Sequence, residues 1–190
     1  MRFLNILFGR SKPVKSRPDR LFAISTAEIT MSSRYGLIPS GTAGVCFRPI
    51  SSSFFAEAER ELREMLDLGA KQTESRIRVT SDNYGFQWVI AEDKDFSDLV
   101  NTIYTVSLTL QEHGFEDQLL AAVFKLEEEG RRTVYLIYNY KRAQYYPFVP
   151  VGNSQERDNA TELRLKGSLQ KELPIDSDLE RWYALWGVPL

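Results

Sequence analysis

Residues 118–140 read QLLAAVFKLEEEGRRTVYLIYNY and decide the fold of this 190-residue chain. Within residues 118–126 and 132–140, apolar residues occupy consecutive positions at 119–124 and 134–138, so both faces of a strand would carry apolar side chains. An acidic turn, Glu127-Glu128-Glu129-Gly130, separates the two segments. Antiparallel strands that are apolar on both faces are typical of the centre of a sheet covered on both sides. We therefore expect a central β-hairpin here.

The segments on the N-terminal side of this hairpin predict a second hairpin and two helices. In residues 76–90, apolar and polar side chains alternate on both sides of a turn at 81–85. Apolar side chains recur at helical spacing in residues 53–68, and Gly69 is the expected end of this helix. A second helix is expected to begin within residues 92–95 and to end at Gly114. Residues 24–31 and 44–50 are rich in strand-forming residues, so we expect them to be the first two strands.

The predicted order is strand, strand, helix, repeated three times and followed by a helical C-terminus that includes residues 179–186. This order favours the α+β class, with a mostly antiparallel sheet and helices packed on it. The length of the chain predicts a single domain, here residues 21–190. Residues 1–20 form a separate N-terminal segment and tether, because two prolines and five charged side chains fall within residues 11–20.

Charge is unevenly distributed along the chain. Residues 1–20 hold six cationic side chains and one carboxylate, a net charge of +5, whereas residues 21–190 have a net charge of −7. An apolar stretch opens the basic segment, which predicts contact with anionic lipid or with an acidic partner helix. The residues expected to make this contact are Phe3, Leu4, Leu7, Phe8, Arg10, Lys12 and Lys15. The alternative is that these apolar side chains dock on the core of the same chain.

Composition excludes several function classes. The acidic body argues against nucleic acid as the main partner, because binding to phosphates needs a cationic surface on the folded domain. No segment approaches the roughly 18–20 apolar residues of a membrane span. The N-terminus lacks the apolar core and cleavage site of a signal peptide. A single cysteine, Cys46, rules out an intrachain disulfide. We therefore expect a cytoplasmic protein, with peripheral membrane contact as the alternative setting.

No residue pattern predicts catalysis. The chain has no phosphate-binding loop, dinucleotide-binding glycine pattern or HExxH motif. His113, the only histidine, falls at a predicted helix end, where it would stabilise the helix dipole. Cys46 lies in a predicted strand without a second cysteine or a neighbouring histidine, so we expect a buried, inert thiol. The sequence thus predicts a non-enzymatic protein that holds neither a cofactor nor a metal.

One aromatic segment is a candidate partner surface. Residues 138–150 combine tyrosines, two cations and two prolines where a strand passes into a loop. Aromatic rings beside arginine are enriched at binding hot spots, although such rings also fill protein cores. The candidate residues are Tyr140, Lys141, Arg142, Tyr145 and Tyr146. We expect that replacing both cations with alanine weakens partner capture and leaves the melting temperature nearly unchanged, because exposed charges contribute little to folding.

An ordered set of segments resembles the PspAB family, the PspA-associated proteins. The set is FGRSKPVK at 8–15, GTAGVCFR at 41–48, DNYGFQW at 82–88, YKR at 140–142 leading to YPF at 146–148, RDNATEL at 157–163, and DLERW at 178–182 leading to WG at 186–187. The resemblance implies a cytoplasmic accessory of the phage-shock, or envelope-stress, response built around the coiled-coil protein PspA. It supplies no catalytic residues. The helix and strand pattern also resembles secretion-chaperone-like folds, a likeness that says little about function.

The preferred hypothesis is an adaptor that binds a PspA-type coiled coil or another stress-response protein, and also the anionic membrane surface. The alternative is an enzyme or small-ligand-binding protein with a pocket between sheet and helices. Trp88, Tyr138, Tyr140 and Lys141 would line such a pocket, whereas a filled interface would favour the adaptor. A chaperone-like dimer that holds a partner segment is a third alternative. The oligomeric state stays open.

Overall fold

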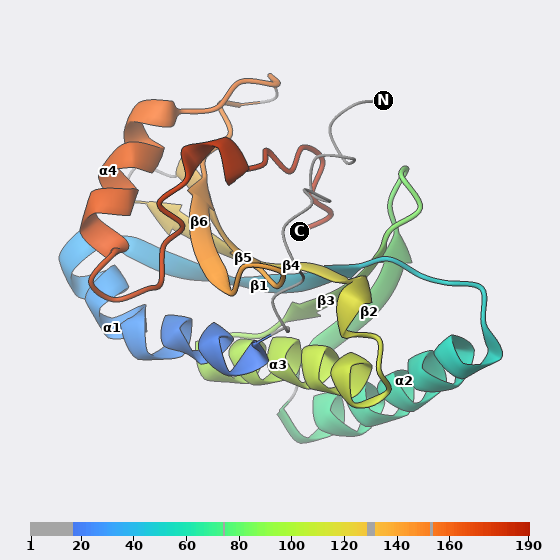
Figure 1. Ribbon diagram of the computed structural model, residues 1–190. Coiled ribbons are helices and arrows are strands. Elements are labelled where there is room, and N and C mark those ends of the chain that lie inside the picture. The colour runs from blue at the N-terminus through green and yellow to red at the C-terminus, as the bar shows by residue number, and fades with distance from the viewer. Residues whose placement is uncertain (1–16, 74, 129–131, 153) are drawn as a thin grey trace.

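In the computed structural model, six strands form one antiparallel sheet with four helices packed on it (Figure 1). The structure describes residues 17–73, 75–128, 132–152 and 154–190. The strand order is β2-β3-β1-β4-β5-β6, so β2 and β6 are the two edges of the sheet. In chain order the strands are β1 (Leu37–Phe47), β2 (Arg76–Ser81), β3 (Gln87–Glu92), β4 (Leu119–Glu128), β5 (Arg132–Asn139) and β6 (Gln144–Phe148).

The helices are α1 (Ala23–Tyr35), α2 (Ser53–Thr73), α3 (Phe96–Glu112) and α4 (Asn159–Leu169). α1, α2 and α3 lie on one side of the sheet, and α4 lies beside β6 (Figure 1). The residues that follow α4 cross the opposite side of the sheet, and we call residues 174–190 the C-terminal strap (Figure 1). The α+β class with a helical C-terminal region, predicted from the sequence, is thus confirmed.

Alternation along the strands divides the apolar side chains between two cores. One core lies under the helices, where Phe124 of β4 and Leu136 of β5 are fully buried. The other lies under the C-terminal strap, where Val123 and Ile137 from the same two strands meet Trp182. Because both faces of the hairpin are buried, the apolar runs of residues 118–140 have no polar side to turn to solvent. The central position predicted for this hairpin is confirmed.

The first predicted strand is wrong. Residues 24–31 belong to helix α1. Its β-branched residues favour a strand, but the buried side chains, Ile24, Ala27 and Met31, recur at helical spacing against the core. A 3-10 turn at Pro18–Phe22 leads into the helix, and Gly36 ends it in the left-handed conformation at a φ of 62°.

Two other predicted boundaries shift. The strand predicted at residues 44–50 instead begins at Leu37 and ends at Phe47 as β1, which pairs with β4 across an irregularity between Pro39 and Thr42. Helix α2 continues through Gly69 to Thr73, so this glycine is not a cap. A glycine inside a helix costs about 1 kcal/mol relative to alanine, which packing elsewhere along the helix can offset. The hairpin of β2 and β3 and the helix α3, capped by Asp95, match their predictions.

Candidate functional site

The candidate site lies at the turn between β5 and β6, where the sequence places the partner surface. Asn139 shapes this turn, because its carbonyl accepts the N–H of Ala143 at 2.8 Å and its Oδ1 accepts the N–H of Lys141 at 3.0 Å. Ala143 is buried and adopts a φ of 53°, a left-handed conformation that few residues other than glycine take. The turn therefore fixes how Lys141 and Arg142 leave the strand.

The tyrosines of this segment lie in the core. Tyr140, Tyr145 and Tyr146 are at most 2% exposed. The Tyr146 hydroxyl donates to the carbonyl of Tyr183 at 3.1 Å, the Tyr145 hydroxyl donates to the carbonyl of Leu21, and the Tyr140 hydroxyl pairs with Ser107. Burial raises the pKa of all three phenols. These rings offer no surface to a partner, and their burial argues against the predicted place of the three tyrosines in a partner surface.

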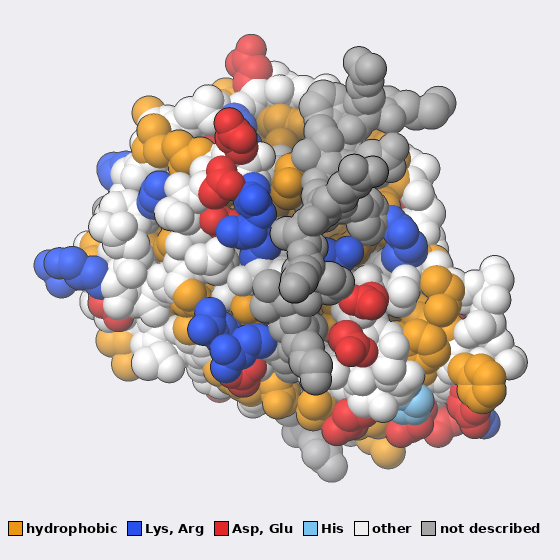
Figure 2. All heavy atoms as spheres, in the orientation of Figure 1, with side chains coloured by type: hydrophobic (Ala, Val, Ile, Leu, Met, Phe, Trp, Pro, Cys, Tyr) orange, Lys and Arg blue, Asp and Glu red, His pale blue; other side chains and the backbone are white. Residues whose placement is uncertain are grey.

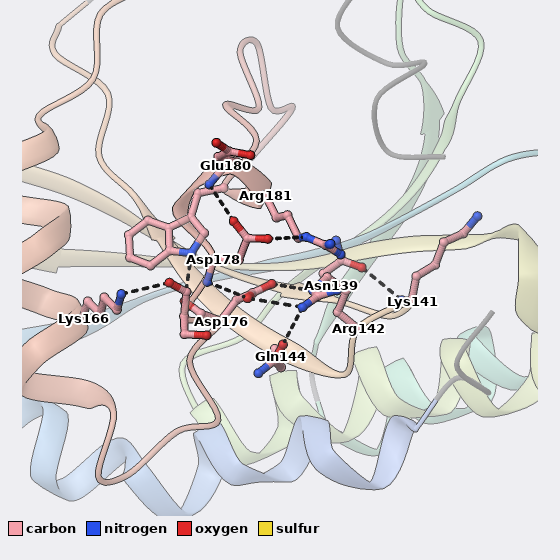
Figure 3. Close-up of polar contacts among 11 residues, drawn as sticks. Asn139, Lys141, Arg142, Gln144, Lys166, Asp176, Asp178, Glu180 and Arg181 are labelled. Atoms are coloured by element: carbon pink, nitrogen blue, oxygen red, sulfur yellow. Dashed lines mark hydrogen bonds and ion pairs between the residues drawn. The ribbon is translucent and has the colours of Figure 1, made fainter. Parts of the chain in front are cut away.

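Arg142 is partly exposed, but its guanidinium is bound within the molecule. Its Nε donates to Asp176 Oδ2 at 2.6 Å, and its second amino group lies 3.4 Å from Gln144 Oε1 (Figure 3). The Asp176 side chain is only 4% exposed, so the pair joins the β5–β6 turn to a carboxylate in the interior of the C-terminal strap. A buried carboxylate needs such a partner, because an unpaired buried charge is costly. Arg142 therefore has a structural role.

Asp176 is the centre of a polar network in the strap. Its Oδ1 accepts the N–H of Asp178 at 3.0 Å, and its carbonyl accepts the indole N–H of Trp182 at 3.1 Å (Figure 3). Asp178 in turn accepts the N–H of Glu180 at 3.2 Å and the Nε of Arg181 at 2.5 Å. The predicted helix at 179–186 is only a three-residue 3-10 turn, Leu179–Arg181, followed by irregular chain, although its predicted docking on the body is confirmed.

The strap also covers the edge of the sheet at β6. The Tyr145 N–H donates to the carbonyl of Pro174 at 2.8 Å, and the Asp176 N–H donates to the carbonyl of Tyr145 at 2.8 Å. Tyr145 and Ile175 thereby form a parallel bridge. Backbone groups of an edge strand that face outwards invite pairing with another chain. At β6, the strap occupies the groups of Tyr145.

The other predicted site residues fall into three groups. Lys141 points away from the Arg142–Asp176 pair (Figure 3), and burial lowers its pKa. Phe3, Leu4, Leu7, Phe8, Arg10, Lys12 and Lys15 lie outside the described residues. The residues named for the alternative pocket between sheet and helices do not lie on one face, because Tyr138 and Tyr140 are fully buried under the helices whereas Trp88 is buried under the strap.

Cys46 and His113 lie in the positions that the sequence predicts. The Cys46 thiol is buried in β1, and this burial raises its pKa. His113 is the C-cap of α3, with its Nδ1 2.9 Å from the Thr109 carbonyl oxygen and its Nε2 3.0 Å from Glu61 Oε2. Within the described part of the chain, no group of histidine, cysteine and carboxylate side chains is arranged to hold a metal. Both residues are explained by their structural contacts.

A shallow hollow opens between the strap and the loop that follows β6. Its volume is about 360 Å³, and its walls include Tyr135, Phe148 and Trp186. The Phe148 ring meets the Trp186 ring edge to face at 5.0 Å. The Arg157 guanidinium lies over the Phe148 ring, 5.5 Å from its centroid, and forms a 2.8 Å ion pair with the buried Glu162. Among the described residues that line the hollow there is no carboxylate, so these residues offer contact area rather than acid–base groups.

The sequence analysis missed two features, Asp176 and the free edge at β2. Asp176 has no local sequence signal, because its partner Arg142 lies 34 positions away. Residues 76–81 alternate as a strand, but only the strand order reveals that β2 is an edge. On the face in Figure 2, cationic and acidic side chains are interspersed, with no broad cationic field. No helix in the described residues is long and apolar enough to cross a membrane.

Comparison with known proteins gives one family. The family model of PspAB, PspA associated protein B, matches residues 1–190. No curated protein and no solved structure matches the chain. The match spans every segment quoted for the resemblance, from the basic N-terminus to the strap. The chain therefore belongs to the PspAB family, the PspA-associated proteins B.

Proposed function

We propose that this protein is a non-enzymatic accessory of the PspA membrane-stress response that binds a PspA-type coiled-coil protein in the cytoplasm. The observation that carries this proposal is the family match over the full chain, whose description names association with PspA. Association needs a surface and not a reactive centre, which suits a chain whose histidine and cysteine both have structural contacts.

The filled interior supports an adaptor over an enzyme. Helices α1, α2 and α3 cover one face of the sheet and the strap covers the other, and the aromatic side chains between them are buried. Enzymes bind small substrates in concave pockets that bring a few polar groups together. Between the sheet and the helices, the rings of Tyr138 and Tyr140 pack edge to face at 5.2 Å instead.

The basic N-terminal segment supports contact with the anionic inner face of the membrane. Residues 1–20 carry a net charge of +5 beside five apolar side chains. Each lysine or arginine near an anionic surface contributes about 1 kcal/mol, and ordering the segment offsets part of that gain. Binding of this kind is reversible and weakens at high salt.

A capture experiment tests the association directly. The immobilised full chain is mixed with a purified PspA-type coiled-coil protein, and bound protein is measured after washing. We expect capture above that of an unrelated acidic α+β protein of similar size. Equal retention on both would contradict the proposed association.

The membrane contact has its own test, sedimentation with anionic vesicles. We expect the full chain to pellet with phosphatidylserine vesicles, and the double change Lys12→Glu and Lys15→Glu to reduce pelleting. The matched control, Lys71→Glu with Lys171→Glu, reverses two exposed charges elsewhere and should pellet like the natural chain. Equal loss in both double variants would show a response to net charge alone.

A small-ligand-binding role is the second candidate, favoured by the hollow between the strap and the loop after β6. Its volume of about 360 Å³ lies in the range of ligand pockets, and Tyr135 and Trp186 offer aromatic contact. A ligand held there should raise the melting temperature, and Trp186→Ala should abolish that rise. Absence of any stabilisation across a small-molecule library would count against this role.

A further inference from the structure

We propose that the open edge of β2 receives an extended segment of a partner protein by β-strand addition, and that this segment alternates acidic and apolar residues. The inference deepens the proposed function, because it names a place on the chain where a partner would bind. Strand addition is a common mode of peptide recognition, in which backbone hydrogen bonds supply affinity and alternate side chains supply specificity.

The hydrogen-bond pattern defines which groups of β2 are available. β2 pairs with β3 in unbroken register from Arg76 opposite Glu92 to Ser81 opposite Gln87. The Asp82 N–H donates to the Phe86 carbonyl at 2.9 Å, which fixes the phase of the ladder. Residues 76, 78 and 80 therefore bond to β3, while the N–H and C=O groups of residues 77, 79 and 81 point to the outer side. Within the described residues, β3 is the only strand beside β2.

Proteins protect sheet edges with proline, a bulge, a covering segment or charged side chains. Of these, β2 carries the charges of the exposed Arg76 and Arg78, which disfavour a cationic strand and leave the edge open to an acidic one. β2 contains no proline, and its pairing with β3 has no register shift. At the other edge, by contrast, Pro174 and Asp176 of the strap bond to Tyr145 of β6. β2 is thus the edge at which a further strand can extend the sheet.

The side chains of β2 specify the chemistry of that strand. Arg76 and Arg78 are exposed on the face of the sheet that carries the strap, and Arg78 donates to the Pro189 carbonyl at 2.5 Å. Ile77 and Val79 are half-buried on the helix face, against the core. Directly opposed side chains on neighbouring antiparallel strands lie about 4.5–5.5 Å apart. A segment with carboxylates opposite the arginines and apolar side chains opposite Ile77 and Val79 complements both faces.

Two carboxylates of the same chain, those of Glu92 and Asp82, lie near this edge, but neither lies on the outer side of β2 where the partner segment would bind. Glu92 stands opposite Arg76 on β3, on the inner side of the strand. Asp82 accepts the backbone N–H groups of Tyr84 and Phe86 and the indole N–H of Trp88, at 2.8, 3.0 and 3.1 Å. If the β2 strands of two copies paired antiparallel about residue 79, Arg76 of one copy would lie opposite Asp82 of the other. The Asp82 carboxylate already accepts three hydrogen bonds within its own chain. A partner with its own free carboxylates fits better.

A peptide-binding experiment on the full chain tests the inference. The probe is a fluorescein-labelled octapeptide of alternating Glu and Val, read by fluorescence anisotropy. The control is a peptide of the same composition in Glu-Glu-Val-Val blocks, which in a strand cannot place all its carboxylates on one face and all its valines on the other. We expect the alternating peptide to bind at least tenfold more tightly than the block peptide. Equal affinity for both peptides would overturn the inference.

Two variants place the peptide at the edge. Val79→Pro removes one outward N–H and spares the ladder to β3, so we expect at least a tenfold loss of affinity, while Val79→Ala stays within threefold. Arg76→Glu should weaken binding of the Glu-Val peptide and strengthen binding of a Lys-Val peptide. Undiminished binding to a folded Val79→Pro variant would contradict the inference. If that variant does not fold, peptides N-methylated on alternate residues replace it, and only one phase of methylation should abolish binding to the natural chain.

Two further readouts distinguish strand addition at β2 from a homodimer interface and from the proposed association with a PspA-type protein. If light scattering finds a dimer that Val79→Pro converts to a monomer, the edge serves a second copy and the inference fails. If the Val79→Pro chain captures the PspA-type protein as well as the natural chain does, the proposed function stands and the edge is not its site. If the natural chain binds the Glu-Val peptide but captures no PspA-type protein, the edge stands and the proposed function fails.

Discussion

The two edges of the sheet differ in how their backbone groups are used. At β6, the strap forms a parallel bridge through Ile175 and seals the edge with bonds to Tyr145. At β2, the outward groups face away from β3 and no described strand lies beyond them. Each edge also carries an arginine, but Arg142 is paired to the buried Asp176 whereas Arg76 is exposed.

This difference teaches that an arginine beside aromatic residues is not by itself a binding surface. At the β6 end, the arginine and the tyrosines that attract attention in the sequence hold the strap in place. At the β2 end, the outward backbone groups have no neighbouring strand within the described residues. A role in binding is therefore better sought at the edge that the fold leaves open than at the one it closes.

The largest effect is expected from removing the residue that anchors the strap. Trp182 is 5% exposed, stacks on Tyr146 and donates to the Asp176 carbonyl. Trp182→Ala should lower the free energy of unfolding by about 3–5 kcal/mol, because it leaves a cavity and an unpaired carbonyl. Urea unfolding measures this loss, with the half-exposed Leu179→Ala as the control. Similar small losses in both would show that the strap does not hold the β6 edge.

The buried ion pair should come next. Asp176→Ala removes the acceptor of Arg142 and of the Asp178 N–H, so we expect a loss of about 2–4 kcal/mol, discounted because the arginine is partly exposed. Arg142→Ala should also destabilise the fold, and more than Lys141→Ala does. This replaces the sequence-based expectation that changing both cations leaves the melting temperature nearly unchanged. Equal melting temperatures for the two single variants would restore that expectation.

A pair of proline substitutions compares the inner and outer sides of β2. Thr80→Pro removes an N–H that bonds to Trp88 of β3, whereas Val79→Pro removes one that points outwards. Thr80→Pro should therefore cost about 1–3 kcal/mol more than Val79→Pro. Thermal unfolding of the two variants measures the difference. A larger cost for Val79→Pro would mean that the outward group is already bonded and that the edge is closed.

The smallest effect is expected at His113, away from both edges. The hydrogen bond to the Thr109 carbonyl, followed by the charge of Glu61, raises the pKa of this imidazole. The stabilisation by the protonated form is complete below the ordinary pKa of about 6.5 and is lost as the pH rises through the higher folded-state pKa. His113→Gln should remove less than about 1 kcal/mol at pH 5.5 and less again at pH 8.5. A variant that destabilises more at pH 8.5 would contradict this sign.

The sequence predicts the fold where its signals are local, and it fails where they are not. Apolar side chains on both faces of residues 118–140 identify the central hairpin, and the acidic stretch at 92–95 marks the start of α3, where Asp95 is the N-cap. Residues 24–31 mislead because β-branched residues favour strands, while burial of Ile24 and Met31 against the core stabilises a helix. Pairing between distant positions, such as Arg142 with Asp176, has no local signature. The open edge follows only from the order of the strands.

Residue-resolved amide hydrogen exchange on the full chain tests the contrast between the edges most directly. In the free protein, the amides of Ile77, Val79 and Ser81 should exchange fast, while the Tyr145 amide, bonded to Pro174, should be protected. Addition of the alternating Glu-Val peptide should slow the three β2 amides and leave Tyr145 unchanged. Protection of the β2 amides in the free protein, or exchange at Tyr145 as fast as at Val79, would contradict the account.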